Sequence, residues 1–171
     1  VQAIGLKAEI EGLRKEGCVA LENESYAVFR ARGNTIPVLL RAIGRARELA
    51  FRAAGEGTGK DLDLDVFDAS YTQLVLWHKA SERIAGSYRM AWTQDVLPVN
   101  GVRGLYTSTL FRFAPEFFQA LGPAVELGRS FISPEFQKDY APLLLLWQAI
   151  GRSVTARPDA PVLFGPVSIS A

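Results

Sequence analysis

The spacing of apolar residues in the first third of the chain changes from helical to strand-like and back. Apolar residues at helical spacing predict a short amphipathic helix over residues 6–16. Apolar and polar residues then alternate on both sides of a polar turn over residues 18–30, which predicts a β-hairpin. Pro37 can open a helix at its first turn, and helical spacing extends this predicted helix to about Ala54.

The rest of the chain predicts mostly strands. Helical segments are expected after Pro115 and after Pro134, and Pro142 marks the start of the second segment or a kink in it. This order of elements, with antiparallel hairpins and a late strand–helix–strand unit, predicts one α/β domain with a mixed sheet. Strands are predicted at Gln73–His78, Arg83–Trp92, Thr109–Phe113, Val125–Ser133 and Val162–Ile169.

Composition narrows the class of protein. The 171 residues suit one ordinary domain, and 49% hydrophobic residues argue against disorder. Lys and Arg number 19 against 18 Asp and Glu, so charge gives no reason to expect nucleic acid. With only Cys18 and His78 we predict no metal site, and we interpret both residues as structural. No apolar run reaches the roughly 18–20 residues that span a bilayer. The chain lacks an initiator methionine, so we expect a fragment of a longer protein.

The densest acidic stretch of the chain contains Asp63, Asp65 and Asp68. In an extended segment the first two point to the same side. Apolar residues lie between these aspartates, which favours partial burial, and buried carboxylates need arginine or lysine partners. A solvated acidic loop or a weak cation site is the alternative interpretation. The candidate partners are Arg41, Arg45 and Arg47 on the preceding helix and Arg89 inside a strand.

A second candidate is the segment from Glu126 to Arg129. In a regular strand Glu126 and Gly128 share one face, while Leu127 and Arg129 share the other. A glutamate followed by a glycine on its own face leaves room for a substrate beside a general base. A structural Glu–Arg ion pair is the alternative.

Two further stretches allow a functional and a structural interpretation. The three glycines of residues 55–60 follow a helix and lack P-loop spacing, so they predict a mobile gate instead of a phosphate cradle. Five phenylalanines could line an acyl pocket or pack in the core. They are Phe111, Phe113, Phe117, Phe118 and Phe131.

These motifs, in this order, resemble a known family. From about residue 36 to its end, the chain resembles the group of GNAT-like N-acyltransferases labelled hemolysins, which is related to the ornithine lipid N-acyltransferases. The acyl-homoserine-lactone synthases are similar more distantly. Their charged pattern falls on Arg47/Phe51, Asp63/Asp65/Asp68, Arg89 and Glu126/Arg129. The closer resemblance rests on Arg41–Arg52, Gly55–Lys60, Leu62–Asp68, Gly86–Arg89, Tyr106–Thr107, Glu126–Phe131, Leu143–Trp147 and Leu163–Ser170.

The resemblance implies a GNAT-like fold, a mixed and largely antiparallel sheet flanked by helices. It implies an amide-forming acyltransferase without a permanent cofactor, which takes a fatty acyl thioester from acyl carrier protein or coenzyme A to an amino acid, ornithine in the nearest relatives. Residues 1–171 would be one domain, with further strands beyond it and a phospholipid-type acyltransferase domain fused to it. We expect a cytoplasmic protein able to contact the inner face of the membrane peripherally.

The same resemblance assigns roles to residues. Glu126 is the candidate base, and the catalytic network would comprise Arg129, Arg47, Asp65, Asp68 and Arg89. Backbone N–H groups near Phe131–Ser133 would stabilise the oxyanion, with the donor phosphate near the helix after Pro134. A non-catalytic binding module and a homoserine-lactone synthase are the alternatives. The predicted substrate-binding residues are Asp63, Phe51, Phe131, Ile132, Ser133, Gln137 and Lys138.

Overall fold

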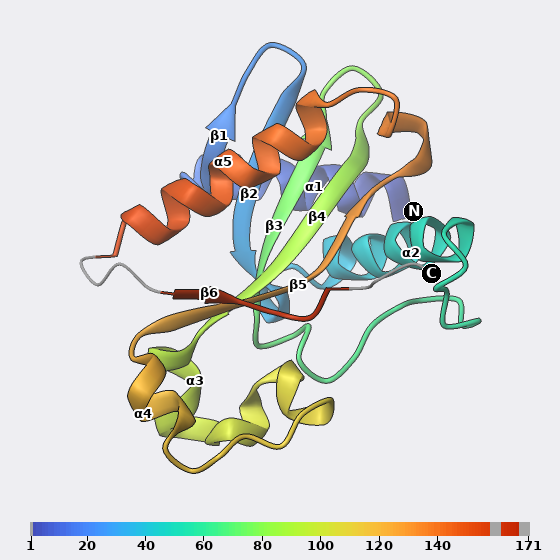
Figure 1. Ribbon diagram of the computed structural model, residues 1–171. Helices are drawn as coiled ribbons and strands as arrows, with labels where there is room; N and C mark the ends of the chain where they lie inside the picture. The colour runs from blue at the N-terminus through green and yellow to red at the C-terminus, as the bar shows by residue number, and fades with distance from the viewer. Residues whose placement is uncertain (1, 158–161, 168–171) are drawn as a thin grey trace.

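The computed structural model of the protein describes residues 2–157 and 162–167. Its strands form one sheet in the order β1-β2-β3-β4-β5-β6, so neighbours in sequence are neighbours in space (Figure 1). All pairs are antiparallel except β5–β6, which is parallel. The strands are β1 (Val19–Glu22), β2 (Tyr26–Arg32), β3 (Thr72–His78), β4 (Arg83–Trp92), β5 (Ala124–Ile132) and β6 (Val162–Phe164).

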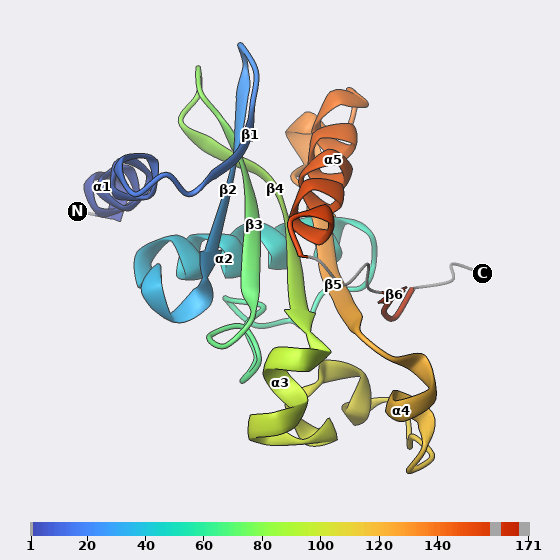
Figure 2. The same ribbon diagram turned by 90° about the vertical axis from the view of Figure 1, so that its left-hand side faces the viewer.

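Helices cover both faces of this sheet. In Figure 2, α1 and α2 lie on one face and α5 on the other, while α3 and α4 lie beyond one end of the strands. The helices are α1 (Gln2–Lys15), α2 (Pro37–Ala53), α3 (Thr93–Asn100), α4 (Phe117–Leu121) and α5 (Ala141–Thr155). Short 3-10 turns are η1 (Gly33–Thr35), η2 (Val102–Gly104), η3 (Tyr106–Thr109) and η4 (Pro134–Phe136).

Two apolar layers hold these elements together. The alternation within each strand sends one set of side chains to each face, as in β3, where Leu74 and Leu76 face α5 while Val75 faces α2. On the α2 face these side chains pack with Leu39 and Ile43 of α2, both completely buried. The predicted α/β architecture with a mixed, largely antiparallel sheet is confirmed.

Two local predictions are wrong, and one helix was missed. Thr109–Phe113 forms no strand: Thr109 ends η3, and the residues after it lead towards α4, outside the sheet order of the described residues. The helix α3 was not predicted, since β-branched residues and Pro98 hide its helical pattern. Pro134 opens only the 3-10 turn η4, and α5 begins later, with Pro142 in its first turn. Of the predicted strand Val162–Ile169, the last two residues lie outside the described residues.

The strand β5 extends beyond its pairing with β6, and the candidate site lies along this part of β5. The ladder between β5 and β6 ends at the pair Glu126 and Phe164 among the described residues, whereas β5 continues to Ile132 beside β4. A Cβ atom at Gly165 would lie 2.0 Å from the carbonyl oxygen of Leu127, so only glycine lets the chain after β6 pass here. Beyond this point no strand among the described residues pairs with the edge of β5 that faces away from β4.

Candidate active site

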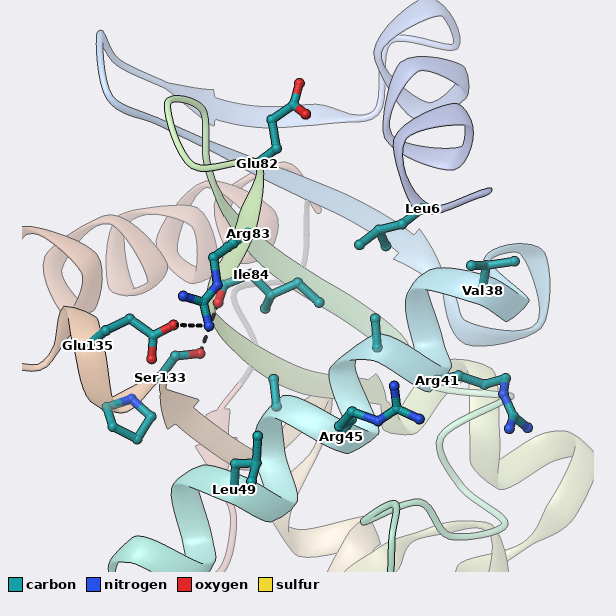
Figure 3. A pocket seen from close by; sticks show the side chains of 13 residues that line it. Leu6, Val38, Arg41, Arg45, Leu49, Glu82, Arg83, Ile84, Ser133 and Glu135 are labelled. Carbon is teal, nitrogen blue, oxygen red and sulfur yellow. Dashed lines mark hydrogen bonds and ion pairs between the residues drawn. The ribbon is translucent and has the colours of Figure 1, made fainter. Parts of the chain in front are cut away.

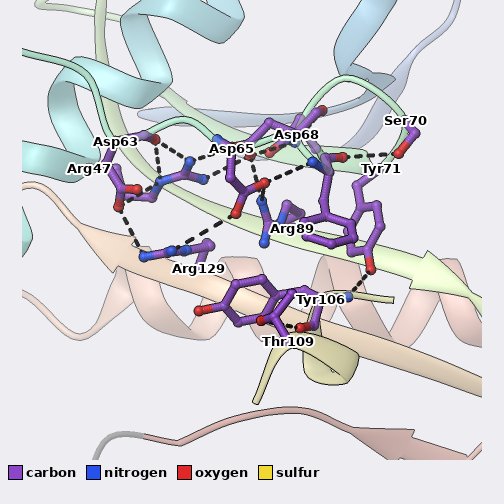
Figure 4. A network of polar contacts seen from close by, with 12 residues as sticks. Arg47, Asp63, Asp65, Asp68, Ser70, Tyr71, Arg89, Tyr106, Thr109 and Arg129 are labelled. Atoms are coloured by element: carbon purple, nitrogen blue, oxygen red, sulfur yellow. Dashed lines mark hydrogen bonds and ion pairs between the residues drawn. The ribbon is translucent and has the colours of Figure 1, made fainter. Parts of the chain in front are cut away.

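Arg47 is the centre of a buried charged network between α2 and the sheet (Figure 4). Its side chain is completely buried, and its guanidinium group donates to both carboxylate oxygens of Asp68, at 3.1 and 2.8 Å. Its Nε donates to the carbonyl oxygen of Asp63 at 3.1 Å and lies 3.3 Å from the Asp63 carboxylate. Since Leu39, Ile43 and Arg47 share the buried face of α2, the helix directs this arginine into the interior.

The acidic segment reaches Arg47 because it packs directly on α2 at Gly44. The backbone N–H of Asp63 donates to the carbonyl oxygen of Gly44 at 3.0 Å. A Cβ atom at Gly44 would lie 2.6 Å from Cγ of Leu64, so a larger residue would push the segment away from the helix. The predicted partnership between Asp63, Asp68 and Arg47 therefore depends on a glycine that sequence analysis did not single out.

Arg89 joins the network from β4. Its Nη1 lies 2.6 Å from Asp65 and 3.1 Å from Asp68, and the side chain is 1% exposed. The guanidinium carbon lies 5.0 Å from the ring centre of Tyr71 and 5.1 Å from that of Tyr106, which adds cation–π attraction. Among the described residues, its Nε and Nη2 are buried without a hydrogen-bond partner. The strand arginine thus has the carboxylate partners that its position predicted.

Arg129 lies on the opposite face from the one predicted. Between the pairs Ser87–Phe131 and Arg89–Gly128, β5 holds one residue more than β4, and Arg129 has a positive φ of 49°. This β-bulge breaks the alternation and brings the Arg129 side chain to the α2 face. There its Nη1 lies 3.3 Å from Asp63 and its Nη2 3.9 Å from Asp65. A regular period of two could not reveal this reversal.

Glu126 is bound by a separate set of donors. Its carboxylate is 1% exposed and accepts a short hydrogen bond from the Tyr71 hydroxyl. The backbone N–H groups of Tyr106 and Thr107 donate to it at 3.0 and 2.7 Å. The alternative of a Glu126–Arg129 ion pair is wrong for the described contacts, because the two side chains bind different partners.

Burial and charge shift three pKa values in the site. Burial alone would raise the pKa of Asp68, but the hydrogen bond and charge of Arg47 and the charge of Arg89 outweigh burial and lower it. Burial would lower the pKa of Arg89, but the charges of Asp68 and Asp65 raise it. Burial and the nearby charge of Glu126 raise the pKa of Tyr71 well above its ordinary value. These shifts favour the ionised forms of Asp68 and Arg89 at neutral pH, and they favour the protonated form of the Tyr71 hydroxyl.

A groove of about 390 Å³ runs along the open end of β5 on the α5 face. We call it the donor groove. Phe131, Ile132 and Gln137, all predicted to bind substrate, line it together with Tyr140 and Leu143 at the start of α5. The Gln137 side chain donates to the carbonyl oxygen of Ile132 at 2.8 Å. The groove thus lies where the resemblance expects an acyl thioester.

Three other residues predicted to bind substrate do not line the donor groove. Ser133 cannot provide an oxyanion donor in this arrangement, because its N–H donates to Ala85 O and its hydroxyl to Ile84 O, both at 2.9 Å. Lys138 is exposed next to Gln137, and Phe51 is half-buried against the α2-face core. The side chains of Phe113, Phe117, Phe118 and Phe164 contact one another near α4 and β6, away from the core residue Phe131.

The predicted gate over residues 55–60 is attached to α2 by Glu48. Its carboxylate accepts hydrogen bonds from the N–H and hydroxyl of Thr58, at 2.9 and 2.6 Å, and from the N–H of Gly59 at 3.0 Å. The hydrogen bond from Thr58 is the main cause that lowers the pKa of Glu48 to about 2, with burial opposing it. Mobility of this loop stays a prediction.

Sequence analysis missed Tyr71, Tyr106, Thr107 and Glu48 as members of the site. Tyr106–Thr107 belonged to the family resemblance, yet no spacing rule relates it to Glu126, which is 20 residues away from Tyr106. Tyr71 is separated from Glu126 by 55 residues. These contacts are set by the sheet register and by the turn η3, which only the folded chain brings together.

Comparison with known proteins gives matches over this same region. Residues 46–148 match the family described as "Acetyltransferase (GNAT) domain". Two similar proteins, from Bacteroides thetaiotaomicron and Phocaeicola vulgatus, are each named glycine N(alpha)-acyltransferase. Each is 36% identical over 176 residues and aligns with 96% of this chain. The chain spans 51% and 53% of their lengths, about half of each.

Proposed function

Because the chain belongs to the GNAT acetyltransferase family, and thus to acyltransferases that act on an amine, we propose that it transfers a fatty acyl group from a thioester to the α-amine of glycine. The observation that carries the proposal is the edge of β5 beyond Leu127, which has no strand partner among the described residues and lies close to the buried carboxylate of Glu126. A thioester bound at this edge would lie beside a group able to accept a proton. The names of the two relatives support glycine as the acceptor.

The donor would bind through its phosphopantetheine arm. The donor groove, lined by Ile132 and Gln137, leads along the open edge of β5 to the start of α5. Backbone groups on an open strand edge can hydrogen-bond an amide-bearing arm in the manner of an added strand. Donors of this family are acyl-coenzyme A thioesters, and acyl carrier protein presents the same arm, so the geometry supports both carriers.

Glu126 would act as the base. The α-amine is protonated at neutral pH and must lose a proton before it attacks the thioester carbonyl. Since the Glu126 carboxylate is buried and accepts from Tyr71, the proton would reach it through water or through the Tyr71 hydroxyl. The amine nitrogen then bonds to the carbonyl carbon, and the thiolate leaves with a proton as the thiol.

The charged network would hold the acceptor. Arg129 is 22% exposed and its Nε has no hydrogen-bond partner among the described residues, so it can bind the carboxylate of an amino acid. Ornithine is the second candidate acceptor. In the part of the chain that the structure describes, Asp65 Oδ2 also accepts no hydrogen bond, so it could accept one from a side-chain ammonium group.

The central test is Glu126→Gln in the full-length protein, with Glu116→Gln on the surface as the matched control. We expect Glu126→Gln to lower kcat by about 10²–10⁴-fold, the usual contribution of a general base, while the control keeps the wild-type rate. Product would be followed by mass spectrometry with glycine, ornithine and homoserine-lactone precursors offered separately. Wild-type kcat in a folded Glu126→Gln variant would refute the role of Glu126 as base.

The same experiment separates the remaining alternatives. Thioester binding without transfer to any amine would identify a binding module, and a lactone product would identify a signal synthase.

We further propose that the protein acts in the cytoplasm at the inner face of the membrane, with acyl carrier protein as its partner. Exposed Leu143, Leu144 and Trp147 on α5 support peripheral contact with lipid. No helix among residues 2–157 and 162–167 is long and apolar enough to cross a membrane. Failure to co-sediment with anionic vesicles would argue against this contact.

A further inference from the structure

A second cavity, of about 490 Å³, lies on the α2 face between α1, α2 and the adjacent ends of β4 and β5 (Figure 3). We call it the α2-face cleft. Sequence analysis did not single out its apolar lining for any role. That lining comprises Leu6, Val38, Ala42, Ala46, Leu49 and Ile84.

The cleft exists because small residues occupy one stripe of α2. Val38, Ala42 and Ala46 follow one another at intervals of four, so they lie on one side of the helix. The two alanines are too short to fill the space toward Ile84 of β4 and toward Ser133, the residue after β5. Larger residues at these two positions would close the cleft from the α2 side.

The chemistry of the lining indicates an apolar occupant. Among the described lining residues, no side-chain nitrogen or oxygen is buried without a hydrogen-bond partner. The Ser133 hydroxyl, for example, already donates to Ile84 O. The charged residues of the lining are all exposed, and two of them, Arg83 and Glu135, form an ion pair at 2.6 Å. The other three are Arg41, Arg45 and Glu82. A polar ligand would find no unsatisfied group inside, whereas an alkyl chain would match the walls and leave the rim hydrated.

The cleft adjoins the donor groove. Ile132 lines the groove on the α5 face, and the next residue, Ser133, lines the cleft on the α2 face. Because β5 has no partner in the described residues on its outer edge after Glu126, no backbone ladder separates the two faces there. A chain that starts from a thioester at this edge can pass around β5 and lie against α2.

From this arrangement we infer that the α2-face cleft binds the alkyl chain of the acyl donor and sets the preferred chain length. The inference rests on the proposed function, which supplies the donor. A volume of about 490 Å³ lies within the range of about 300–1,000 Å³ that is usual for small-molecule sites. The alanine stripe would form the wall that limits the chain.

The test uses the full-length protein with coenzyme A thioesters from acetyl to hexadecanoyl and glycine as acceptor. We expect Ala46→Leu to lower the ratio of kcat/KM for hexadecanoyl over acetyl donors by about tenfold or more, since a pocket discriminates strongly against chain length that it cannot hold. The matched control is Ala53→Leu, an exposed alanine on the same helix, which should leave the ratio unchanged. An equal loss with all donors, or no change of the ratio, overturns the inference.

A binding measurement keeps the inference testable if no transfer occurs. A hexadecanoic acid carrying a photoreactive diazirine at its end is irradiated with the protein, and the labelled peptides are identified by mass spectrometry. We expect labels in residues 38–49 and near Ile84, reduced in Ala46→Leu but not in Ala53→Leu. Labels confined to Phe113–Phe118 or to the outer face of α5 would contradict the cleft. Absence of any acylated amine with correct labelling would refute the proposed function alone.

Discussion

The two faces of the sheet are built from the same strands and yet differ in chemistry around the site. Toward α5, Leu74 of β3, Met90 of β4 and Val125 of β5 are completely buried and apolar. Toward α2, their sequence neighbours Gln73, Arg89 and Glu126 are equally buried and polar. Around the site, the α5 face is an ordinary apolar core, whereas the α2 face holds a charged interior, closed by α2 and the acidic segment, beside its own apolar core.

This difference indicates what each face is for. An apolar layer stabilises a fold at least as well as a buried ion network, because desolvation cancels most of the attraction between the charges. The α2 face retains Arg47, Arg89 and Arg129 against three aspartates instead. We interpret the presence of these buried charges, despite the free energy that their desolvation costs, as a sign that this face must bind charged groups.

The largest effect is expected when the network loses one partner. Arg47→Met should lower the free energy of unfolding by about 3–5 kcal/mol, because the buried Asp63 and Asp68 would both lose the completely buried arginine that contacts them. Urea denaturation of the purified chain measures this. Arg41→Met, an exposed arginine on the same helix, should change it by no more than about 0.5 kcal/mol. Similar losses of unfolding free energy in both variants would show that the buried network contributes no more to stability than an exposed arginine does.

A cavity on the apolar face should cost slightly less and should lack any charge dependence. Leu74→Ala should lower the free energy of unfolding by about 2–5 kcal/mol, since the residue is completely buried. The same loss is expected at neutral and at acidic pH. A loss that depends on pH would mean that the two faces are coupled, which would contradict the comparison drawn above.

The charged face should respond to acid. The pKa of Asp68 is lowered from 3.8, so its contribution is present above that value and is lost as the pH falls through the lower folded pKa. Stability should therefore decline below about pH 4. Asp68→Asn should weaken this decline, and Leu74→Ala should leave its slope unchanged. An unchanged slope in Asp68→Asn would rule out Asp68 as its source.

The smallest effect is expected at the loop attached to Glu48. Its pKa is about 2 instead of 4.5, so its contacts persist at neutral pH and are lost as the pH falls between these values. Glu48→Gln should accelerate amide hydrogen exchange at Thr58 and Gly59 without unfolding the network. Exposed Glu16→Gln is the control. Unchanged exchange in Glu48→Gln would mean that other contacts hold the loop.

Local patterns predicted most elements well. The helix over 6–16, the hairpin, the helix from Pro37 and the three central strands needed only periodicity and turn residues, because each element buries a regular face. The strand prediction at 109–113 was wrong, since Thr109 and the aromatic Phe111 and Phe113 favour a strand but cannot supply a neighbouring strand to pair with.

The contacts within the charged network were predicted only in part, and the residues that bind Glu126 were missed. Spacing and charge were enough to link the acidic segment with Arg47 and Arg89, because buried carboxylates need cations. The face of Arg129 depended on a bulge, and a bulge leaves no mark in a period-two pattern. Tyr71 and Thr107 reach Glu126 only through the folded sheet and turn.

By itself, the sequence determined which residues are apolar, where helices start and which charges must find partners, since these follow from local chemistry. The tertiary structure alone decided that Gly44 admits the acidic segment, that Arg129 turns to the α2 face and that β5 parts from β6 after Glu126. Each of these depends on contacts between segments far apart in the chain. The physical reason is that register and close approach are properties of pairs of elements, which no single stretch of sequence contains.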